Sequence, residues 1–310
     1  MKRCSSSWRA AAVWLLMAAG AATVTGQQAF RGGTELVGLT ITVLDGNNRL
    51  VAGLDEEDFQ VFEDNVRQDI SNFSRQPQPT ALSLVIDTSV SMEPRLTVAQ
   101  GAAIGFVRRM GANDLTQVLS FDSTTKILIE FTQDKDALER AIRRTEASGS
   151  TSLYNALYTS LRALTQIRQE RGEVRRQAIV LLSDGQDTTS VIPYEDVLDL
   201  AKRSEVVIYA IALQDKPDGT GRNDSSWKEN QYVLGQLTTS TGGKAFAVTD
   251  PTTLPMIYAQ IADELSNQYT IGYASKSTRR DGAWRRILVR VTRPNMTART
   301  KAGYFGPSAR

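Results

Sequence analysis

Apolar residues in the middle of the chain come in short, nearly unbroken runs, and stretches with helical spacing separate these runs. The run at 82–86 stops abruptly at Asp87, and the run at 178–182 stops at Ser183 and Asp184. Continuous apolar runs of this length are typical of strands that are buried on both faces of a parallel sheet. Between the two runs, residues 93–110 predict a helix whose apolar face consists of Leu96, Ala99, Ala103, Phe106 and Val107.

The alternation of strand and helix patterns continues to about residue 268. The further strands that it predicts cover 116–121, 126–131, 206–213 and 245–249, and the further helices lie near 136–146, 152–169, 194–202, 232–238 and 253–268. The short polar segment 122–125 joins two of the strands as a hairpin, which makes one edge of the sheet antiparallel. We therefore expect an α/β domain over residues 80–268 with a doubly wound, mostly parallel sheet.

The pattern changes to short strands on both sides of this domain. Alternation at 39–44 and the apolar residues Phe59, Val61 and Phe62 predict strands within residues 35–75, and a turn sequence follows each of them. The segment 269–306 predicts further strands, at 269–273, 284–291 and 297–305. Neither segment has enough apolar residues for a core of its own, so we expect the two to pair in a small β-sandwich-like module that flanks the α/β domain.

Two polar segments each allow two interpretations. The acidic cluster 55–58 could bind a cation, although a solvated loop that opens a strand is the better interpretation. The segment 214–226 is rich in glycine and long for a connection from a strand to a helix, and it would overhang the carboxyl edge of the sheet. It is therefore either a recognition loop or a disordered one.

Candidate metal-binding side chains follow the end of the first apolar run. Asp87, Ser89 and Ser91 stand at alternate positions, so a tight turn can direct three oxygens to one point. Ligands of open α/β sheets bind at the carboxyl ends of the strands. Oxygen donors without nitrogen or sulfur suit Mg²⁺, Mn²⁺ or Ca²⁺, which makes this turn a candidate cation site.

The same turn allows three other interpretations. A calcium loop of the EF-hand type needs glycine at its sixth position and glutamate at its twelfth, where this chain has Met92 and Val98. A phosphotransferase with Asp87 as nucleophile would place a second carboxylate two residues later, where Ser89 stands. A strand end followed by helix-capping serines remains the alternative if the turn is considered alone.

Two downstream segments complete a pattern. Thr151 opens a helix in the sequence Ser-Gly-Ser-Thr-Ser-Leu, and the second apolar run ends in Ser-Asp-Gly. Asp-x-Ser-x-Ser, a threonine at a helix start and a strand that ends in Ser-Asp-Gly form the metal-ion-dependent adhesion site, so residues 80–268 resemble the von Willebrand factor type A domain family. All five positions of the motif match, and they are Asp87, Ser89, Ser91, Thr151 and Asp184. Val90 stands where many members carry glycine, and this difference removes no ligand.

The resemblance implies a mode of binding. In the family the two serines and the threonine coordinate the metal directly when ligand is bound, the aspartates act partly through water, and a carboxylate of the partner completes the coordination sphere. It also implies a shift of the last helix, here 253–268, between states of low and high affinity. The segments around 61–64, 269–273 and 284–287 further resemble a secreted bacterial subgroup, the von Willebrand type A-related proteins of acidobacterial type, which supplies a fold and a site but no defined role.

The charges of the site lead to the same expectation independently of the family resemblance. Asp87 and Asp184 roughly neutralise a divalent ion, and the three hydroxyls add only neutral oxygens. A six-coordinate ion held in this way keeps a position for water or an incoming ligand, and an anion is favoured there. We expect a divalent cation, Mg²⁺ before Mn²⁺ or Ca²⁺, and a protein partner that presents an Asp or Glu side chain.

Composition narrows the chemistry further. The 310 residues are 41% hydrophobic and 23% charged, as in ordinary globular proteins, and they include no histidine and one cysteine, Cys4. Catalysis by Ser-His-Asp or Cys-His and zinc sites of His or Cys are therefore unavailable to residues 27–310. The arginine pairs are scattered, which favours solvent-exposed helix or strand faces, and they are Arg108-Arg109, Arg143-Arg144, Arg175-Arg176 and Arg285-Arg286.

The first 26 residues have the order of a secretory signal peptide. Lys2, Arg3 and Arg9 precede or begin a short apolar run over 10–22, and small residues lead to Gly26. Without this segment 33 basic residues face 34 acidic ones, a net charge of −1 that gives no electrostatic footprint for nucleic acid. We expect a secreted, periplasmic or surface protein of a bacterium with no transmembrane span after cleavage, the alternative being an uncleaved anchor.

Two functions from different classes follow. The first is a non-enzymatic, metal-dependent protein-binding module of the adhesion type. The second is a metal-dependent hydrolase that uses an activated water, for which Glu93 and Asp187 are the carboxylates near the motif that could serve as the base. The motif favours the binding module.

Overall fold

A computed structural model of the chain describes residues 36–171, 175–214 and 224–308. The signal segment expected over residues 1–26 lies outside these ranges. The largest sheet has six strands in the order β10-β9-β8-β5-β6-β7. These strands are β5 (Thr80–Asp87), β6 (Leu115–Phe121), β7 (Thr125–Thr132), β8 (Arg176–Ser183), β9 (Val206–Leu213) and β10 (Ala245–Val248).

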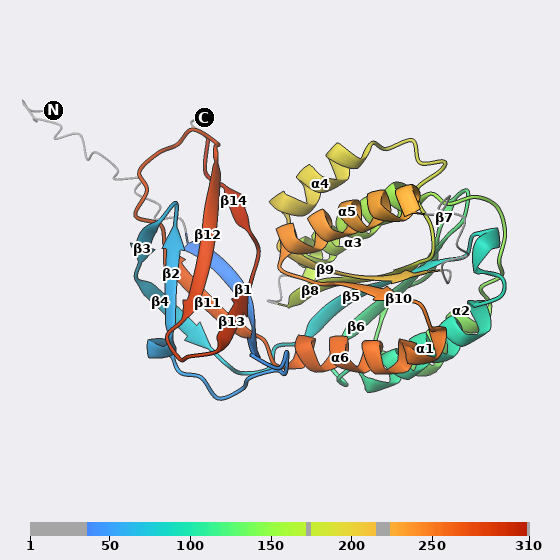
Figure 1. The fold of residues 1–310 in the computed structure, drawn as a ribbon, viewed down its shortest axis with the longest axis horizontal. Coiled ribbons are helices and arrows are strands. Elements are labelled where there is room, and N and C mark those ends of the chain that lie inside the picture. Colours follow the sequence, from blue (N-terminus) through green and yellow to red (C-terminus); the bar gives the residue numbers. More distant parts are fainter. Residues whose placement is uncertain (1–35, 172–174, 215–223, 309–310) are drawn as a thin grey trace, which may run out of the picture. The chain divides into compact units, whose positions relative to one another are not determined.

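The sheet is doubly wound and mostly parallel. Strand β7 pairs antiparallel with β6, as the hairpin pattern predicted, and the other neighbours are parallel. Every residue of β5, β6, β8 and β9 is buried, because helices cover both faces of the sheet. On one face lie α1 (Leu96–Arg109), α2 (Lys135–Arg143) and α6 (Leu254–Ser266), and on the other α3 (Leu153–Arg171), α4 (Tyr194–Arg203) and α5 (Asp224–Thr241) (Figure 1).

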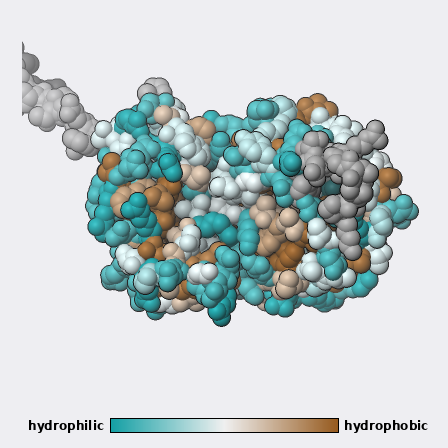
Figure 2. All heavy atoms as spheres, in the orientation of Figure 1, coloured by the Kyte–Doolittle hydropathy of each residue, from teal (hydrophilic) through white to brown (hydrophobic). Residues whose placement is uncertain are grey.

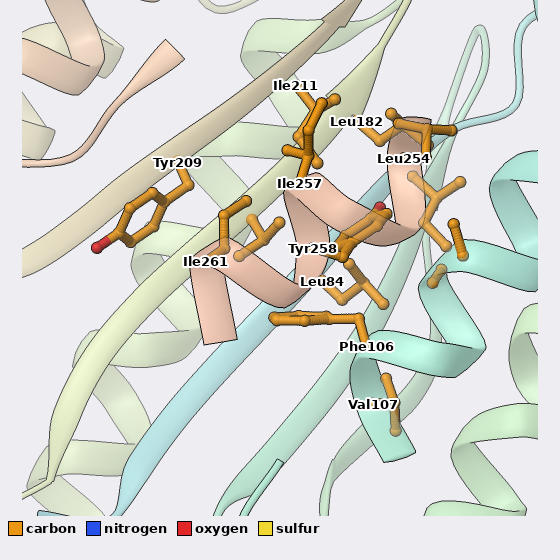
Figure 3. Packing of buried hydrophobic residues seen from close by; sticks show 14 of the residues in the cluster. Leu84, Phe106, Val107, Leu182, Tyr209, Ile211, Leu254, Ile257, Tyr258 and Ile261 are labelled. Carbon is orange, nitrogen blue, oxygen red and sulfur yellow. The ribbon is translucent and has the colours of Figure 1, made fainter. Parts of the chain in front are cut away.

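Helix α6 packs beside α1 against one face of the sheet. Figure 3 shows Ile257, Tyr258 and Ile261 of this helix among side chains of β5, β8, β9 and α1. The rings of Tyr258 and Phe106 lie 5.0 Å apart. The apolar residues that recur with helical spacing in α6 thus form the face that this helix buries.

Some element ends differ from the expectation. The helix expected at 93–110 begins only at Leu96, because Val90–Met92 forms a separate turn of 3₁₀ helix, η2. The helix expected at 232–238 spans Asp224–Thr241, since its earlier turns expose residues such as Lys228 and Glu229 and therefore lack an apolar period. Residues 215–223 of the expected loop 214–226 lie outside the described residues.

The segments on either side of the α/β domain form two four-stranded antiparallel sheets. Their orders are β13-β1-β11-β4 and β14-β12-β2-β3. The strands are β1 (Leu36–Asp45), β2 (Phe59–Glu63), β3 (Val66–Gln68), β4 (Ile70–Ser74), β11 (Tyr269–Ala274), β12 (Trp284–Val291), β13 (Met296–Arg299) and β14 (Gly303–Phe305). Because each sheet combines strands from before and after the α/β domain, the expected β-sandwich-like module is confirmed. The single strand expected at 297–305 is divided between β13 and β14.

The two sheets share one apolar core. Leu39 and Ile41 of β1 and Tyr269 and Ile271 of β11 pack with residues of the other sheet such as Val61. The acidic cluster 55–58 lies beside this core with Glu56–Asp58 in a 3₁₀ turn, η1. Two of its carboxylates already pair with arginines, Asp55 with Arg75 at 2.8 Å and Asp58 with Arg293 at 2.7 Å.

The arginine pair 285–286 corrects one expectation from the sequence. Neighbouring residues of a strand point to opposite faces, so only Arg286 is exposed, whereas the Arg285 side chain is buried. The Arg285 guanidinium lies 3.4 Å from the Glu63 carboxylate inside the β module. The interpretation as a solvent-exposed face is therefore wrong for Arg285, and it is also wrong for Arg176, which is buried at the start of β8.

The carboxyl end of α6 is tied to the strands that surround it. Arg176 at the start of β8 donates hydrogen bonds to the carbonyl oxygens of Leu265 and Gln268, at 3.1 and 2.6 Å. Glu264 forms an ion pair with Arg299 of β13, and the Arg299 Nε donates to the carbonyl oxygen of Gly242 at 3.1 Å. Two residues separate α6 from β11, so the helix runs almost directly into the β module.

The surface is mainly hydrophilic on the side that Figure 2 shows, and the hydrophobic residues there form separate patches. Within the described ranges we find no helix with the length and apolar character needed to cross a membrane.

Candidate metal centre

The expected site lies where two neighbouring strands end. Strands β5 and β8 are adjacent and parallel, and they stand where the order of the sheet reverses, because the chain continues to β6 on one side and to β9 on the other. Crevices at such a point are the usual ligand sites of open α/β sheets. The pairing brings Asp87 next to Ser183, whose hydroxyl donates to Asp87 Oδ2 at 2.6 Å.

Asp87 is a buried carboxylate without a cationic partner. Its side chain is fully buried, and Oδ1 accepts a hydrogen bond from the Ser89 amide at 2.9 Å. No Lys or Arg of the described residues lies within 4.0 Å of this carboxylate. Burial, with a smaller contribution from the neighbouring Asp184, raises the pKa of Asp87 to about 6 against the lowering effect of hydrogen bonds from Ser183 and Ser89. A carboxylate in this position would be stabilised in its charged form by a bound cation.

The two serines connect Asp87 to the end of β8. The turn η2 begins directly after Ser89, which has extended backbone angles, and brings Ser91 close to it. The Ser89 and Ser91 hydroxyl oxygens lie 3.1 Å apart, and the Ser91 hydroxyl donates to Asp184 Oδ1 at 2.8 Å. These hydroxyls therefore lie between the two carboxylates, as the alternate spacing of the motif predicts.

Thr151 reaches the same place from the loop before α3. The Val90 amide donates to the carbonyl oxygen of Gly149 at 3.1 Å, which joins this loop to the Asp-x-Ser-x-Ser turn. The Thr151 hydroxyl oxygen lies 3.7 Å from the point where a side chain at Gly185 would begin, so it stands beside the residue that follows Asp184. The structure thus brings the turn, the threonine and the second strand end together.

Asp122 holds this loop in place, and the sequence analysis did not identify it. Asp122 Oδ2 accepts hydrogen bonds from the Ser148 hydroxyl and the Lys126 ammonium group, each at 2.9 Å. Burial acts to raise the pKa of Asp122, but hydrogen bonds from Lys126, Thr124 and Ser148 outweigh it and lower the pKa to about 2. The position of Asp122 in a hairpin turn gives no signal in the sequence that it supports the Thr151 loop.

We expect Asp122→Asn to lower the free energy of unfolding by about 1–2 kcal/mol at pH 7. The pKa of Asp122 is lower in the folded state than its ordinary value of 3.8, so its contribution is complete above about pH 5 and is lost as the pH falls toward 2. Urea unfolding at pH 7 and pH 3 checks this, with the difference from wild type roughly halved at pH 3. Asp69→Asn, at a carboxylate that is 84% exposed, is the control, and an equal loss at both pH values would contradict the assignment.

Arg95 is a second residue of the site that the sequence analysis missed. Its guanidinium Nη1 lies 2.8 Å from Asp184 Oδ2, and the two side chains are only 16% and 1% exposed. Asp184 therefore contacts Ser91 with one oxygen and Arg95 with the other. The stretch between Met92 and Leu96 belongs to no motif, so only the fold shows that its arginine reaches the end of β8.

The donors present fit a hard divalent cation. Hydrogen bonds link the two carboxylates through the two serines, the Thr151 hydroxyl stands beside Gly185, and Mg²⁺, Mn²⁺ and Ca²⁺ prefer such oxygen ligands. In the described part of the chain, no three Asp, Glu, His or Cys side chains gather as a metal-binding group, so a site here depends on hydroxyls for most of its donors. The buried Asp87 carboxylate is the feature of this set that a cation would compensate.

The two carboxylates considered as a catalytic base lie in different surroundings. Glu93 is exposed at the end of η2. Asp187 Oδ1 accepts hydrogen bonds from the Ser190 hydroxyl at 2.5 Å and the Tyr154 amide at 3.2 Å, and Oδ2 accepts from the Ser190 amide. Asp187 thus serves to fix a turn against the start of α3.

Comparison of the sequence with known proteins identifies relatives of the α/β domain. The family model of the von Willebrand factor type A domain matches residues 82–186. The uncharacterized protein sll0103 of Synechocystis sp. is 26% identical over 196 residues, which cover 61% of this chain and 42% of that protein. A UPF0353 protein of Mycolicibacterium gilvum is 23% identical over 216 residues, or 64% of each chain. Each match therefore spans less than two thirds of the relative's length.

Solved structures resemble this fold at low sequence identity. A von Willebrand factor type A protein from Catenulispora acidiphila superposes with a TM-score of 0.51 at 12% identity, over 90% of this chain and 76% of that chain. Proximal thread matrix protein 1 from the mussel byssus, solved with a zinc-occupied metal-ion-dependent adhesion motif, gives a TM-score of 0.51 at 16% identity, over 66% and 50%. The match of the family model to residues 82–186 and this shared fold show that the α/β domain has the fold of a von Willebrand factor type A domain.

Proposed function

We propose that this protein is a non-enzymatic, metal-dependent binding module that captures an acidic side chain of a partner protein through a divalent cation. The observation that carries the proposal is the fully buried Asp87 carboxylate, which no Lys or Arg of the described residues approaches within 4.0 Å. Von Willebrand factor type A domains act generally as interaction modules, which supports the same class of function.

The ligand set that we assign is Asp87, Ser89, Ser91, Thr151 and Asp184. The two carboxylates would balance the charge of the ion and the hydroxyls would supply neutral oxygens, which leaves a position for an outside ligand. Bound there, a divalent cation supplies positive charge at the end of the sheet that favours a carboxylate from Asp or Glu. Mg²⁺ is our first choice and Mn²⁺ or Ca²⁺ the alternatives, and the zinc-occupied motif of the mussel protein supports a divalent ion in general.

We also propose a location and a domain division. The order of charged, apolar and small residues in the first 26 positions supports export, and with it a periplasmic, secreted or surface location in a bacterium. The metal-binding domain would cover residues 80–268, and residues 35–75 and 269–306 would form the β module.

Metal binding is the direct test, because it needs no knowledge of the partner. We expect the wild type to bind Mn²⁺ and Mg²⁺ in calorimetric titrations, and Asp87→Ala and Thr151→Ala each to weaken binding at least about 10-fold. Thr97→Ala, which truncates an exposed threonine on α1, is the matched control and should bind like wild type. Circular dichroism should show the same fold in all variants. Unchanged affinity in Asp87→Ala would contradict the ligand assignment.

The hydrolase alternative has less support from the contacts. Asp187 uses both oxygens within its turn, which leaves the exposed Glu93 as the candidate base. Esterase, phosphatase and peptidase assays with Mg²⁺ or Mn²⁺ distinguish the two functions. Metal-dependent turnover that disappears in Asp87→Ala would favour the enzyme over the binding module.

A further inference from the structure

Arg95 stands at the proposed metal site as a cation that belongs to the chain itself. It is the residue before α1, and its backbone is held by a hydrogen bond from its amide to the Met92 carbonyl oxygen at 2.9 Å. Its carbonyl oxygen in turn accepts from the Ala99 amide at 3.0 Å. The guanidinium is therefore presented to Asp184 from an ordered helix start.

This arrangement changes the charge of the site. Asp87 and Asp184 alone would balance the charge of a divalent ion, and the Arg95 guanidinium adds a positive charge beside Asp184. Within the described ranges, no cation other than Arg95 lies within 4.0 Å of either carboxylate. Both Arg95 and Asp184 are largely shielded from solvent, at 16% and 1% exposure, so salt screens their interaction weakly.

The contacts of Asp184 show why the two cations affect each other. One oxygen of this carboxylate accepts from Ser91, a proposed ligand, and the other accepts from Arg95. An ion held by Asp184 and Ser91 would share the carboxylate with the guanidinium, and two positive charges on one carboxylate weaken each other's binding. A negative ligand beside the ion would be attracted by both cations and would offset their mutual repulsion.

We propose that Arg95 couples the capture of a carboxylate ligand to the binding of the metal, by weakening the hold on the ion alone and strengthening the hold on the ion and carboxylate together. Arg95 is thus a specificity residue that makes an acidic partner a condition for tight metal binding. The inference rests on the proposed metal site and names how that site is regulated.

The two effects of removing Arg95 have opposite signs, which gives the proposal a distinctive test. In Arg95→Gln we expect Mn²⁺ alone to bind about 5–10-fold more tightly than in wild type, since one positive charge is lost. In this variant a carboxylate ligand should then increase the affinity for Mn²⁺ by a smaller factor than in wild type. The probe is the tripeptide Gly-Asp-Gly with blocked ends, and Gly-Asn-Gly is its uncharged control.

The experiment measures the Mn²⁺ dissociation constant by calorimetry with and without each peptide. In wild type, Gly-Asp-Gly should tighten Mn²⁺ binding several-fold and Gly-Asn-Gly should not, and in Arg95→Gln the enhancement should fall toward 1-fold. Arg95→Lys keeps the charge and should retain most of the enhancement. Arg108→Gln removes an arginine from the other end of α1, where it pairs with Asp136 and Glu139, and should behave like wild type.

Three results would overturn the coupling. These are weaker or equal Mn²⁺ binding in Arg95→Gln, an equal peptide enhancement in Arg95→Gln and wild type, or no enhancement by Gly-Asp-Gly in wild type.

If one of these results occurs while wild type binds Mn²⁺ and Asp87→Ala does not, the metal site stands and only the role of Arg95 fails. If neither wild type nor Arg95→Gln binds Mn²⁺, the proposed function fails and the coupling fails with it. If Arg95→Gln does not fold, the comparison of Arg95→Lys with wild type decides, and a lost enhancement in that folded variant would contradict a role of charge.

Discussion

Replacing Arg285 with methionine should lower the free energy of unfolding by about 3–5 kcal/mol, because it leaves the buried Glu63 carboxylate without its cation. The two side chains are 1% and 2% exposed, and their charged groups lie 3.4 Å apart. Glu63 also accepts hydrogen bonds from the Tyr273 and Tyr304 hydroxyls at 2.9 and 3.1 Å. Burial and the hydrogen bond to Glu63 both raise the pKa of Tyr273, which keeps this hydroxyl a donor.

Gly306 makes the space that Arg285 needs. A side chain at this position would begin 2.5 Å from the arginine Nε, so the guanidinium lies directly against the glycine backbone. The Arg285 Nη2 donates a hydrogen bond to the Arg279 carbonyl oxygen at 2.5 Å. The group is thus held by contacts from several strands and loops of the β module, and its loss disturbs all of them.

Urea unfolding of four variants tests this ion pair, namely Arg285→Met, Glu63→Gln, the double variant and a control. Arg290→Met, on an exposed position of the same strand, is the control and should cost less than about 1 kcal/mol. The double variant Glu63→Gln with Arg285→Met should lose less stability than the sum of the two single changes, because it leaves no unpaired charge. A loss below about 1 kcal/mol in Arg285→Met would show that the pair contributes little.

The second large effect is expected at the carboxyl end of α6. Arg299→Ala should cost about 2–4 kcal/mol, because it leaves the Glu264 carboxylate, which is fully buried, without the guanidinium that contacts it. Arg299 is itself 21% exposed, so water can reach part of the site and the cost should be smaller than for Arg285. The change also removes the hydrogen bond to the Gly242 carbonyl oxygen.

The neighbouring position on α6 provides a matched control. Asp263 and Arg109 form an ion pair at 3.8 Å in which both side chains are more than half exposed, so Arg109→Ala should cost less than about 1 kcal/mol. Hydrogen exchange adds a local measurement, since Arg299→Ala should speed exchange in α6 and in residues 269–275. Equal stability losses in Arg299→Ala and Arg109→Ala would mean that burial of Glu264 does not decide the effect.

These contacts also bear on the helix shift that the resemblance implied for 253–268. Arg176 and Arg299 hold the last turn of α6 to β8 and β13 through Leu265 and Glu264, and the helix leads into β11 after two residues. A shift of α6 on partner binding would have to break these contacts or carry the β module with it. Hydrogen exchange in residues 269–275, measured with and without partner, would detect such coupling.

The sequence was sufficient for features that depend on local order. Buried parallel strands have unbroken apolar runs, so β5 and β8 and the turn at Asp87 were predictable. The α/β fold and the β-sandwich-like module followed from the change of period along the chain. The assignment of Asp87, Ser89, Ser91, Thr151 and Asp184 as metal ligands stays a prediction that metal titration will test.

Features that depend on contacts between distant parts of the chain could not be predicted from the sequence. Arg95 reaches Asp184 only because the chain crosses from β5 to α1 beside the end of β8, 89 positions later in the sequence. Arg285 was interpreted as exposed because neighbouring arginines give no periodic signal, while the strand places one on each face. The start of α5 was missed because polar residues on its exposed side hide the helical period.

The pairing of strands across the α/β domain has a consequence for the order of folding. Tyr273 and Glu63 are 210 positions apart, and the whole α/β domain lies between the strands that carry them. Contacts at such separation form slowly from an unfolded chain, because the intervening loop must close first. Once the α/β domain is compact, it holds residues near 75 and 269 close together and shortens the remaining search. We therefore expect refolding to protect β5 and β8 before β1 and β11. A nascent chain should keep β1, β2 and β4 without their partners in β11, β12 and β13 until almost the whole sequence has been synthesised.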